Sequence, residues 1–181
     1  MKMQSVPTVT QAAYARRLRE VHPKYEILFR IGIETGLRVS DILAIKAGKV
    51  KPEMKIKEKK TGKPRLIYLP PALMSDVTTY ITTQRLEKSH ALIYSRPWNK
   101  HKPLSRIQAY RIMRREATEM GLKSIGTHSM RKTYAKTLYA ATGEINTVQR
   151  TLNHKHPETT LRYLIPDLEA LIAAELQKLT P

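Results

Sequence analysis

Four short segments of this chain carry side chains that could act on a phosphate group. They are Thr35–Asp41 (TGLRVSD), Lys60–Lys63 (KTGK), His128–Arg131 (HSMR) and Leu152–His154 (LNH), the last followed by Tyr163. Arginine and lysine donors suit an anionic phosphate, and a tyrosine hydroxyl can serve as the nucleophile of a covalent step. Each segment alone has an ordinary structural explanation, such as a surface charge or a core aromatic ring, so the four are judged together.

The overall charge of the chain favours an anionic macromolecular partner. Its 181 residues contain 33 Lys and Arg against 15 Asp and Glu, which gives a formal net charge of +18 and a sequence pI ≈ 10.2. Nucleic acid is the partner that such a field attracts most often. A membrane surface is the weaker alternative, because no polybasic run or helix with a clean basic face is present. We therefore expect a cytoplasmic protein, associated with the nucleoid when bound to DNA.

The residue types also restrict the chemistry. The chain has no cysteine, which excludes a thiolate nucleophile and any Cys-ligated metal. His154 and His156 lie near Glu158, but these residues do not form a ligand cluster of the usual spacing. We expect no metal and no cofactor.

Periodicity predicts a mainly helical α+β domain with one small antiparallel hairpin. The hairpin pairs residues 54–58 with 66–69 around a turn at 61–64. A further short strand is expected at 91–95. Apolar spacing and cap residues predict helices at 10–21, from 24 to Gly36, at 41–46, after Pro71, and at 104–120, 127–141, 145–152 and 166–179. No boundary divides the pattern, so we expect a single domain over 1–181.

Taken in order, the four segments resemble the active-site signature of the tyrosine recombinase family, which includes phage integrases and Xer-type recombinases. The motifs are TGLRVSD, KTGKPRLIYLP, HSMRKT and LNHKHPETTLRYL, and they extend over most of the chain. Two departures are Asn153, where glycine is usual, and Asp41, where glutamate is more frequent. The resemblance implies the catalytic domain alone, without an N-terminal core-binding domain, since residues 1–7 are too short to supply one.

The resemblance assigns a role to each candidate residue. Arg38 and Arg131 would clamp the scissile phosphate, His154 would add a donor, and Tyr163 would attack to give a 3′-phosphotyrosine. Lys60 would protonate the leaving 5′-oxygen. His128 would orient groups or accept the tyrosine proton. Further DNA contacts are expected from Lys59, Lys63, Arg65, Lys132 and Lys155.

Partners and alternatives follow from the same resemblance. Strand exchange implies double-stranded DNA, four protomers in a synapse and, in some systems, accessory DNA-bending proteins. The C-terminal helix at 166–179 could pack on its own domain or on a neighbouring protomer. Two other functions stay open at this point. One is nicking and resealing by a topoisomerase-like enzyme; the other is DNA binding by a regulator that has lost catalysis.

Overall fold

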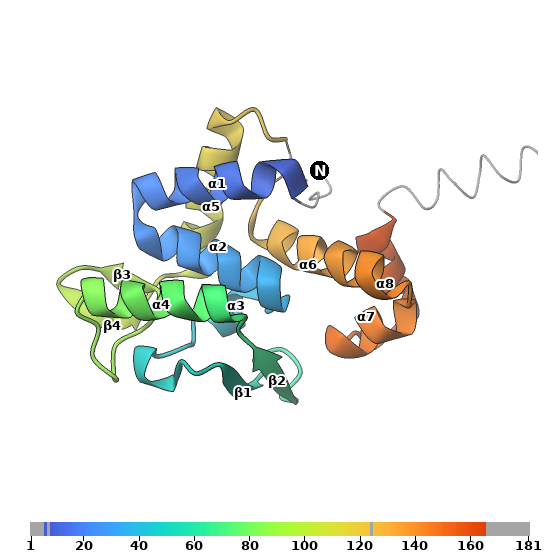
Figure 1. The fold of residues 1–181 in the computed structure, drawn as a ribbon, viewed down its shortest axis with the longest axis horizontal. Helices are drawn as coiled ribbons and strands as arrows, with labels where there is room; N and C mark the ends of the chain where they lie inside the picture. The colour runs from blue at the N-terminus through green and yellow to red at the C-terminus, as the bar shows by residue number, and fades with distance from the viewer. Residues whose placement is uncertain (1–5, 7, 124, 166–181) are drawn as a thin grey trace, which may run out of the picture. The chain divides into compact units, whose positions relative to one another are not determined.

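The computed structural model describes residues 6, 8–123 and 125–165 (Figure 1). These residues fall into two compact units divided between Tyr134 and Ala135, inside helix α6. The two units are described separately below. The predicted helix at 166–179 lies outside the described residues.

The first unit is mainly helical and contains two small antiparallel sheets, which confirms the predicted α+β class. Its elements are α1 (Thr8–Val21), α2 (Pro23–Thr35), α3 (Val39–Ile42), the short 3-10 helix η1 (Ala47–Lys49), β1 (Glu53–Lys57), β2 (Pro64–Tyr68), α4 (Pro71–Thr83), β3 (Tyr94–Arg96), β4 (Asn99–Pro103), α5 (Arg106–Glu119) and the start of α6 (Thr127–Thr142). The second unit holds the rest of α6, α7 (Ile145–Thr151) and α8 (Pro157–Leu164).

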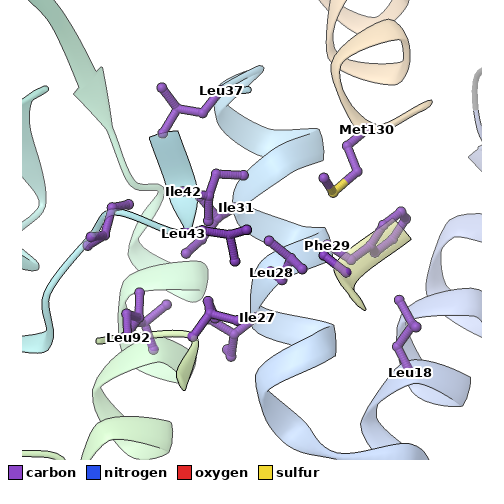
Figure 2. Packing of buried hydrophobic residues seen from close by; sticks show 14 of the residues in the cluster. Leu18, Ile27, Leu28, Phe29, Ile31, Leu37, Ile42, Leu43, Leu92 and Met130 are labelled. Atoms are coloured by element: carbon purple, nitrogen blue, oxygen red, sulfur yellow. The ribbon is translucent and has the colours of Figure 1, made fainter. Parts of the chain in front are cut away.

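Helix α2 lies in the hydrophobic core of the first unit. Its side chains Ile27, Leu28 and Phe29 are buried with neighbours from α1, α3 and the segment before β3 (Figure 2). The start of α6 packs closely against α2 at Gly32, where a Cβ atom would lie 2.4 Å from Sδ of Met130. A larger residue at position 32 would push α6 away. The absence of a side chain there brings the first turns of α6 to the C-terminal half of α2.

Helix α2 ends at Gly36, as the sequence predicted. Gly36 has φ +64° and its N–H donates to the carbonyl of Gly32 at 3.0 Å. This left-handed conformation is a common helix C-cap, and glycine adopts it without steric cost. The chain then turns through Arg38 into α3.

The predicted first hairpin is present, with β1 and β2 antiparallel and Lys55 opposite Leu66. Met54, Arg65 and Ile67 are buried, so this sheet has one buried face and one exposed face. The turn is closed by the N–H of Gly62, which donates to the carbonyl of Glu58 at 2.8 Å.

Two local predictions are corrected by the structure, and two elements were missed. The strand expected at 91–95 is displaced, since β3 begins at Tyr94 and pairs with β4, which was not predicted. The helix expected at 41–46 ends at Ile42 and is followed by η1. Helix α8 was also missed, because its eight residues make only about two turns, which is shorter than the window in which a helical period is recognised.

Candidate functional site

Arg38 is held at the start of α3 by a buried carboxylate. Its Nη1 donates to Oε2 of Glu58 at 2.8 Å, and the side chain is 18% exposed. Glu58 directly follows β1, is fully buried, and also accepts a hydrogen bond from Oγ1 of Thr61 at 2.9 Å. The first hairpin therefore fixes one edge of the Arg38 guanidinium.

Arg131 and Arg65 meet at the C-terminal end of α2. Nη1 of Arg131 donates to the carbonyl of Gly36 at 2.6 Å, and Nη1 of Arg65 donates to the same oxygen at 3.3 Å. Nη2 of Arg65 also donates to the carbonyl of Thr35. The last carbonyls of a helix lack partners within the helix and carry partial negative charge, so two cations stabilise them here.

Arg65, a predicted DNA contact, is placed beside these carbonyls in the first unit. Its side chain is only 6% exposed and lies 3.7 Å from Glu58, between β2 and the end of α2. Its hydrogen bonds link β2 to the end of α2, and its contact with DNA stays a prediction.

The hairpin turn presents its lysines to solvent. The side chains of Lys59, Lys60 and Lys63 are exposed. The backbone N–H of Lys59 donates to Oδ1 of buried Asp41 at 2.9 Å, which ties the turn to α3. Lys60, the predicted general acid, thus extends from a turn that is held in place by the hydrogen bond between Lys59 and Asp41.

The electrostatics of the first unit connect four of the predicted catalytic residues. Partial desolvation of the His128 ring lowers its pKa, and the nearby charges of Arg131, Lys132, Arg38 and Lys60 lower it further, although the residue as a whole is exposed. Arg38, Lys60, His128 and Arg131 are therefore gathered within the range of each other's fields.

The pKa of Glu58 is also lowered, although burial acts on it in the opposite direction. Burial alone would raise its pKa, but hydrogen bonds from Thr61 and Arg38, with the charges of Arg38 and Arg131, lower it overall. The carboxyl is therefore ionised at neutral pH and partly offsets the surrounding positive charge.

Sequence reasoning missed Glu58, although a signal was available. Residues 54, 56 and 58 are two positions apart, so in a strand Glu58 points to the same face as Met54 and Ile56, which is the buried face of the hairpin. A carboxylate at such a position is rarely buried without a cationic partner.

In the second unit, His154 and Tyr163 lie side by side. Their ring centroids are 4.9 Å apart with an interplanar angle of 69°. Nδ1 of His154 is 3.0 Å from Oγ1 of Thr160, a buried residue in α8. Helix α8 thus carries both the predicted nucleophile and a residue that orients the predicted histidine.

The remaining predicted residues are placed as follows. Lys132 is half-buried on α6 in the first unit, and Lys155 is exposed between α7 and α8 in the second. Among residues 6, 8–123 and 125–165, no group of three or more His, Cys, Asp or Glu could hold a metal ion. Over the same residues, no helix is long and apolar enough to cross a membrane.

A mainly helical unit with a lysine-bearing hairpin and arginines gathered at the end of α2 has the fold of a tyrosine recombinase catalytic domain. The model of the phage integrase family matches residues 8–169. The chain belongs to that family, as the resemblance in its motifs had indicated, and is therefore a protein of the integrase/recombinase class.

Two curated relatives agree with this assignment. The probable integrase/recombinase YoeC of Bacillus subtilis (strain 168) is 40% identical over 149 residues, which are 81% of this chain and 80% of that protein. Tyrosine recombinase XerA of Pyrococcus furiosus is 28% identical over 155 residues, covering 82% of this chain. The chain spans only 54% of the length of that XerA.

Solved structures show the same fold. The crystal structure of XerA recombinase matches with a TM-score of 0.72 and 19% identity, covering 100% of this chain and 67% of that one. The pre-cleavage complex of XerH bound to difH substrate matches with a TM-score of 0.71 and 19% identity, covering 90% of this chain and 51% of that one.

Proposed function

We propose that this protein is a site-specific DNA recombinase that cleaves and rejoins strands through a 3′-phosphotyrosine on Tyr163. The observation that carries the proposal is the placing of Arg38 and Arg131 on fixed acceptors, Glu58 Oε2 and the Gly36 carbonyl. Donors held in this way need little rearrangement to meet charge that develops on a phosphate.

The proposed reaction begins with attack of the Tyr163 hydroxyl oxygen on the scissile phosphorus. The Tyr163 O–P bond forms as the P–O5′ bond breaks, so the phosphodiester energy is conserved. The lowered pKa of His128 favours its uncharged form, which can accept the tyrosine proton. Lys60 donates a proton to the leaving 5′-oxygen. Reversal by a 5′-hydroxyl from another strand completes the exchange.

Each cation has a separate task in this scheme. Arg38 and Arg131 bind the nonbridging oxygens, since a planar guanidinium can offer two parallel donors to phosphate. His154, in contact with the Tyr163 ring, adds a donor for the same phosphate. Positive side chains thus supply the charge stabilisation that metal ions supply in other phosphoryl transfers, and we propose a metal-independent reaction.

Known structures of the family support DNA as the partner. XerH was solved on its difH substrate, and lambda integrase was solved as a dimer bound to a core site. By analogy we propose double-stranded DNA and assembly of several protomers for this chain. A tetrameric synapse, accessory DNA-bending proteins and action at the nucleoid are finer parts of the same proposal.

A suicide-substrate assay tests the proposed nucleophile. The protein is incubated with nicked duplexes carrying candidate sites, with a metal chelator present, and the products are separated on a denaturing gel. We expect a covalent protein–DNA band that is absent for Tyr163→Phe and unchanged for Tyr139→Phe. Tyr139 is a matched control because it is an exposed tyrosine of the same unit.

The alternatives give different results. Failure to form an adduct on DNA that the protein binds at low salt would contradict the proposal and favour a non-catalytic DNA-binding protein. An adduct that leads to relaxation of supercoiled plasmid without exchange of strands would favour a topoisomerase-like enzyme.

A further inference from the structure

The second hairpin, β3–β4, carries an aromatic side chain that the reaction does not use. Trp98 lies in the turn between the strands and is 77% exposed. The guanidinium carbon of Arg96 lies 5.4 Å from the centroid of its ring. A large exposed ring costs solvation, so an exposed Trp stacked with an Arg is typical of a contact surface.

The hairpin belongs to the longest stretch of the chain that lacks an acidic residue. No Asp or Glu occurs between Glu87 and Glu116. The same stretch contains eight cations: Lys88, Arg96, Lys100, Lys102, Arg106, Arg111, Arg114 and Arg115. This composition favours a polyanion over a protein surface of mixed charge.

The hairpin is mounted rigidly on the N-terminal end of α2. Nζ of Lys24 lies 4.4 Å from the ring centroid of buried Tyr94 and donates to the carbonyl of Ser95 at 3.4 Å. The hydroxyl of Tyr94 donates to Oε1 of Gln84 at 2.8 Å, and Nζ of Lys100 donates to the Gln84 carbonyl at 2.7 Å. Because these contacts hold strands β3 and β4 in place, the turn that carries Trp98 loses little conformational entropy when it binds a partner.

We propose that the β3–β4 hairpin is a second DNA contact, in which Trp98 packs on the sugar and base edges of the duplex and Arg96 binds a backbone phosphate. This inference rests on the proposed function, because it concerns DNA that flanks the cleavage site. It adds to that function a DNA-binding contact that lies away from the reacting phosphate.

The structure gives an approximate distance for this contact. Figure 1 shows β3–β4 near the start of α2 and α3 near its end, and Arg38 lies at the start of α3. Helix α2 has 13 residues, so at 1.5 Å per residue it is about 20 Å long. At 3.4 Å per base pair, this length corresponds to about six base pairs when α2 lies along the duplex. The contact therefore requires flanking DNA.

The chain contains a single tryptophan, which makes its fluorescence a direct probe of the hairpin. The Tyr163→Phe variant, which cannot form the adduct, is titrated with duplexes that end about three or about twelve base pairs beyond the cleavage position. We expect the emission of Trp98 to change with the longer duplex. With the shorter duplex, binding is still detected by anisotropy of labelled DNA, but the emission stays constant.

Two substitutions and one control test the energetic contribution. Trp98→Ala should weaken binding to the longer duplex by about tenfold and leave binding to the shorter duplex unchanged. Arg96→Ala should reduce the slope of log affinity against log salt by about 0.9, as expected for one lost phosphate contact. Arg16→Ala removes a charge that is also exposed, from α1, and should leave the slope unchanged.

The outcomes separate this inference from the proposed function. Constant Trp98 emission with both duplexes, together with wild-type affinity of Trp98→Ala, would overturn the hairpin contact even if Tyr163 forms its adduct. A change in the sedimentation of DNA-free protein on Trp98→Ala, without a change in DNA affinity, would also overturn it and indicate a protein partner. Absence of an adduct on the short duplex, with the length-dependent emission change present, would contradict the catalytic proposal alone.

Discussion

Replacement of Glu58 by glutamine tests whether the buried carboxylate positions Arg38. The substitution keeps the shape of the side chain and an oxygen acceptor, but removes the charge that faces Arg38 at 2.8 Å and Arg65 at 3.7 Å. Glu53→Gln is the matched control, since it removes the same charge from an exposed position at the start of β1. A change specific to Glu58 therefore reports the buried contact and not the net charge.

The expected loss of stability can be worked out from the burial of the two partners. Two unit charges about 4 Å apart attract by about 4 kcal/mol at an effective dielectric constant of ~20. Removal of one member of a buried pair commonly costs about 3–5 kcal/mol. Because Arg38 is 18% exposed, water recovers part of this energy. We expect a decrease of about 3 kcal/mol in the free energy of unfolding of Glu58→Gln, and a decrease below about 0.5 kcal/mol for Glu53→Gln.

The pH dependence has a definite sign. The pKa of Glu58 is lowered in the folded protein, so its stabilising contribution is present above the ordinary carboxyl pKa of about 4.3 and is lost as pH falls through the lowered value. The difference in unfolding free energy between wild type and Glu58→Gln should therefore be constant near pH 7 and shrink below about pH 4. Urea denaturation followed by circular dichroism at several pH values measures it.

The same substitution should slow cleavage without preventing DNA binding. An arginine that has lost one fixed acceptor samples other orientations, and a displacement near 1 Å can cost about 100-fold in rate. Single-turnover formation of the Tyr163 adduct at saturating DNA is the assay. The reasoning is refuted if Glu58→Gln matches Glu53→Gln in both unfolding free energy and single-turnover rate.

Two further predictions concern the end of α2 and the hairpin. Gly36→Ala should lower the free energy of unfolding by about 3 kcal/mol, because its φ of +64° is strained for alanine and the new Cβ would lie 2.3 Å from Cδ1 of Tyr134. Gly62→Ala is the control, since Gly62 has φ +68° but no atom within 4 Å of the new Cβ, and it should lower the free energy of unfolding by about 1 kcal/mol. Equal urea midpoints for the two variants would contradict the clash with Tyr134. Arg65→Ala should lower the free energy of unfolding by about 2 kcal/mol and leave the salt dependence of DNA affinity the same. Lys63→Ala should reduce the slope of log affinity against log salt by about 0.9 and leave the free energy of unfolding unchanged. The reverse pattern would show that Arg65, and not Lys63, binds a DNA phosphate.

Much of the first unit could be predicted because its signals are local. The helix stop at Gly36 and the turn around Gly62 depend on residues that accept a positive φ, and both are where the sequence placed them. The four candidate segments were recognised by their order and spacing, which need no knowledge of packing. The pairing of the His154 and Tyr163 rings agrees with those motifs.

The errors came from features that depend on tertiary contacts. Strand β4 has the sequence NKHKP, with no apolar alternation, and is held by backbone bonds such as Ala91 N–H to the Lys100 carbonyl at 2.9 Å. The alternation of β2 places Arg65 on the same face as buried Ile67, but its acceptors, the carbonyls of Thr35 and Gly36, belong to a distant helix end that the sequence pattern does not identify. Helix α8 had usable signals in Pro157 and Glu158 at its first turn, but they are weaker than an apolar period.

The hydrogen bond between Arg131 and the Gly36 carbonyl joins residues that are 95 positions apart in the chain. Arg38 and Glu58 are separated by only 20 residues, so a nascent chain that has reached β2 already contains both. It does not yet contain Arg131, which is synthesised only after α5 and the start of α6. Contacts between distant segments also form slowly, since closing a long loop costs more entropy than closing a short one. A partly synthesised or partly folded chain therefore lacks half of the arginine pair, so the proposed DNA cleavage requires the completed fold.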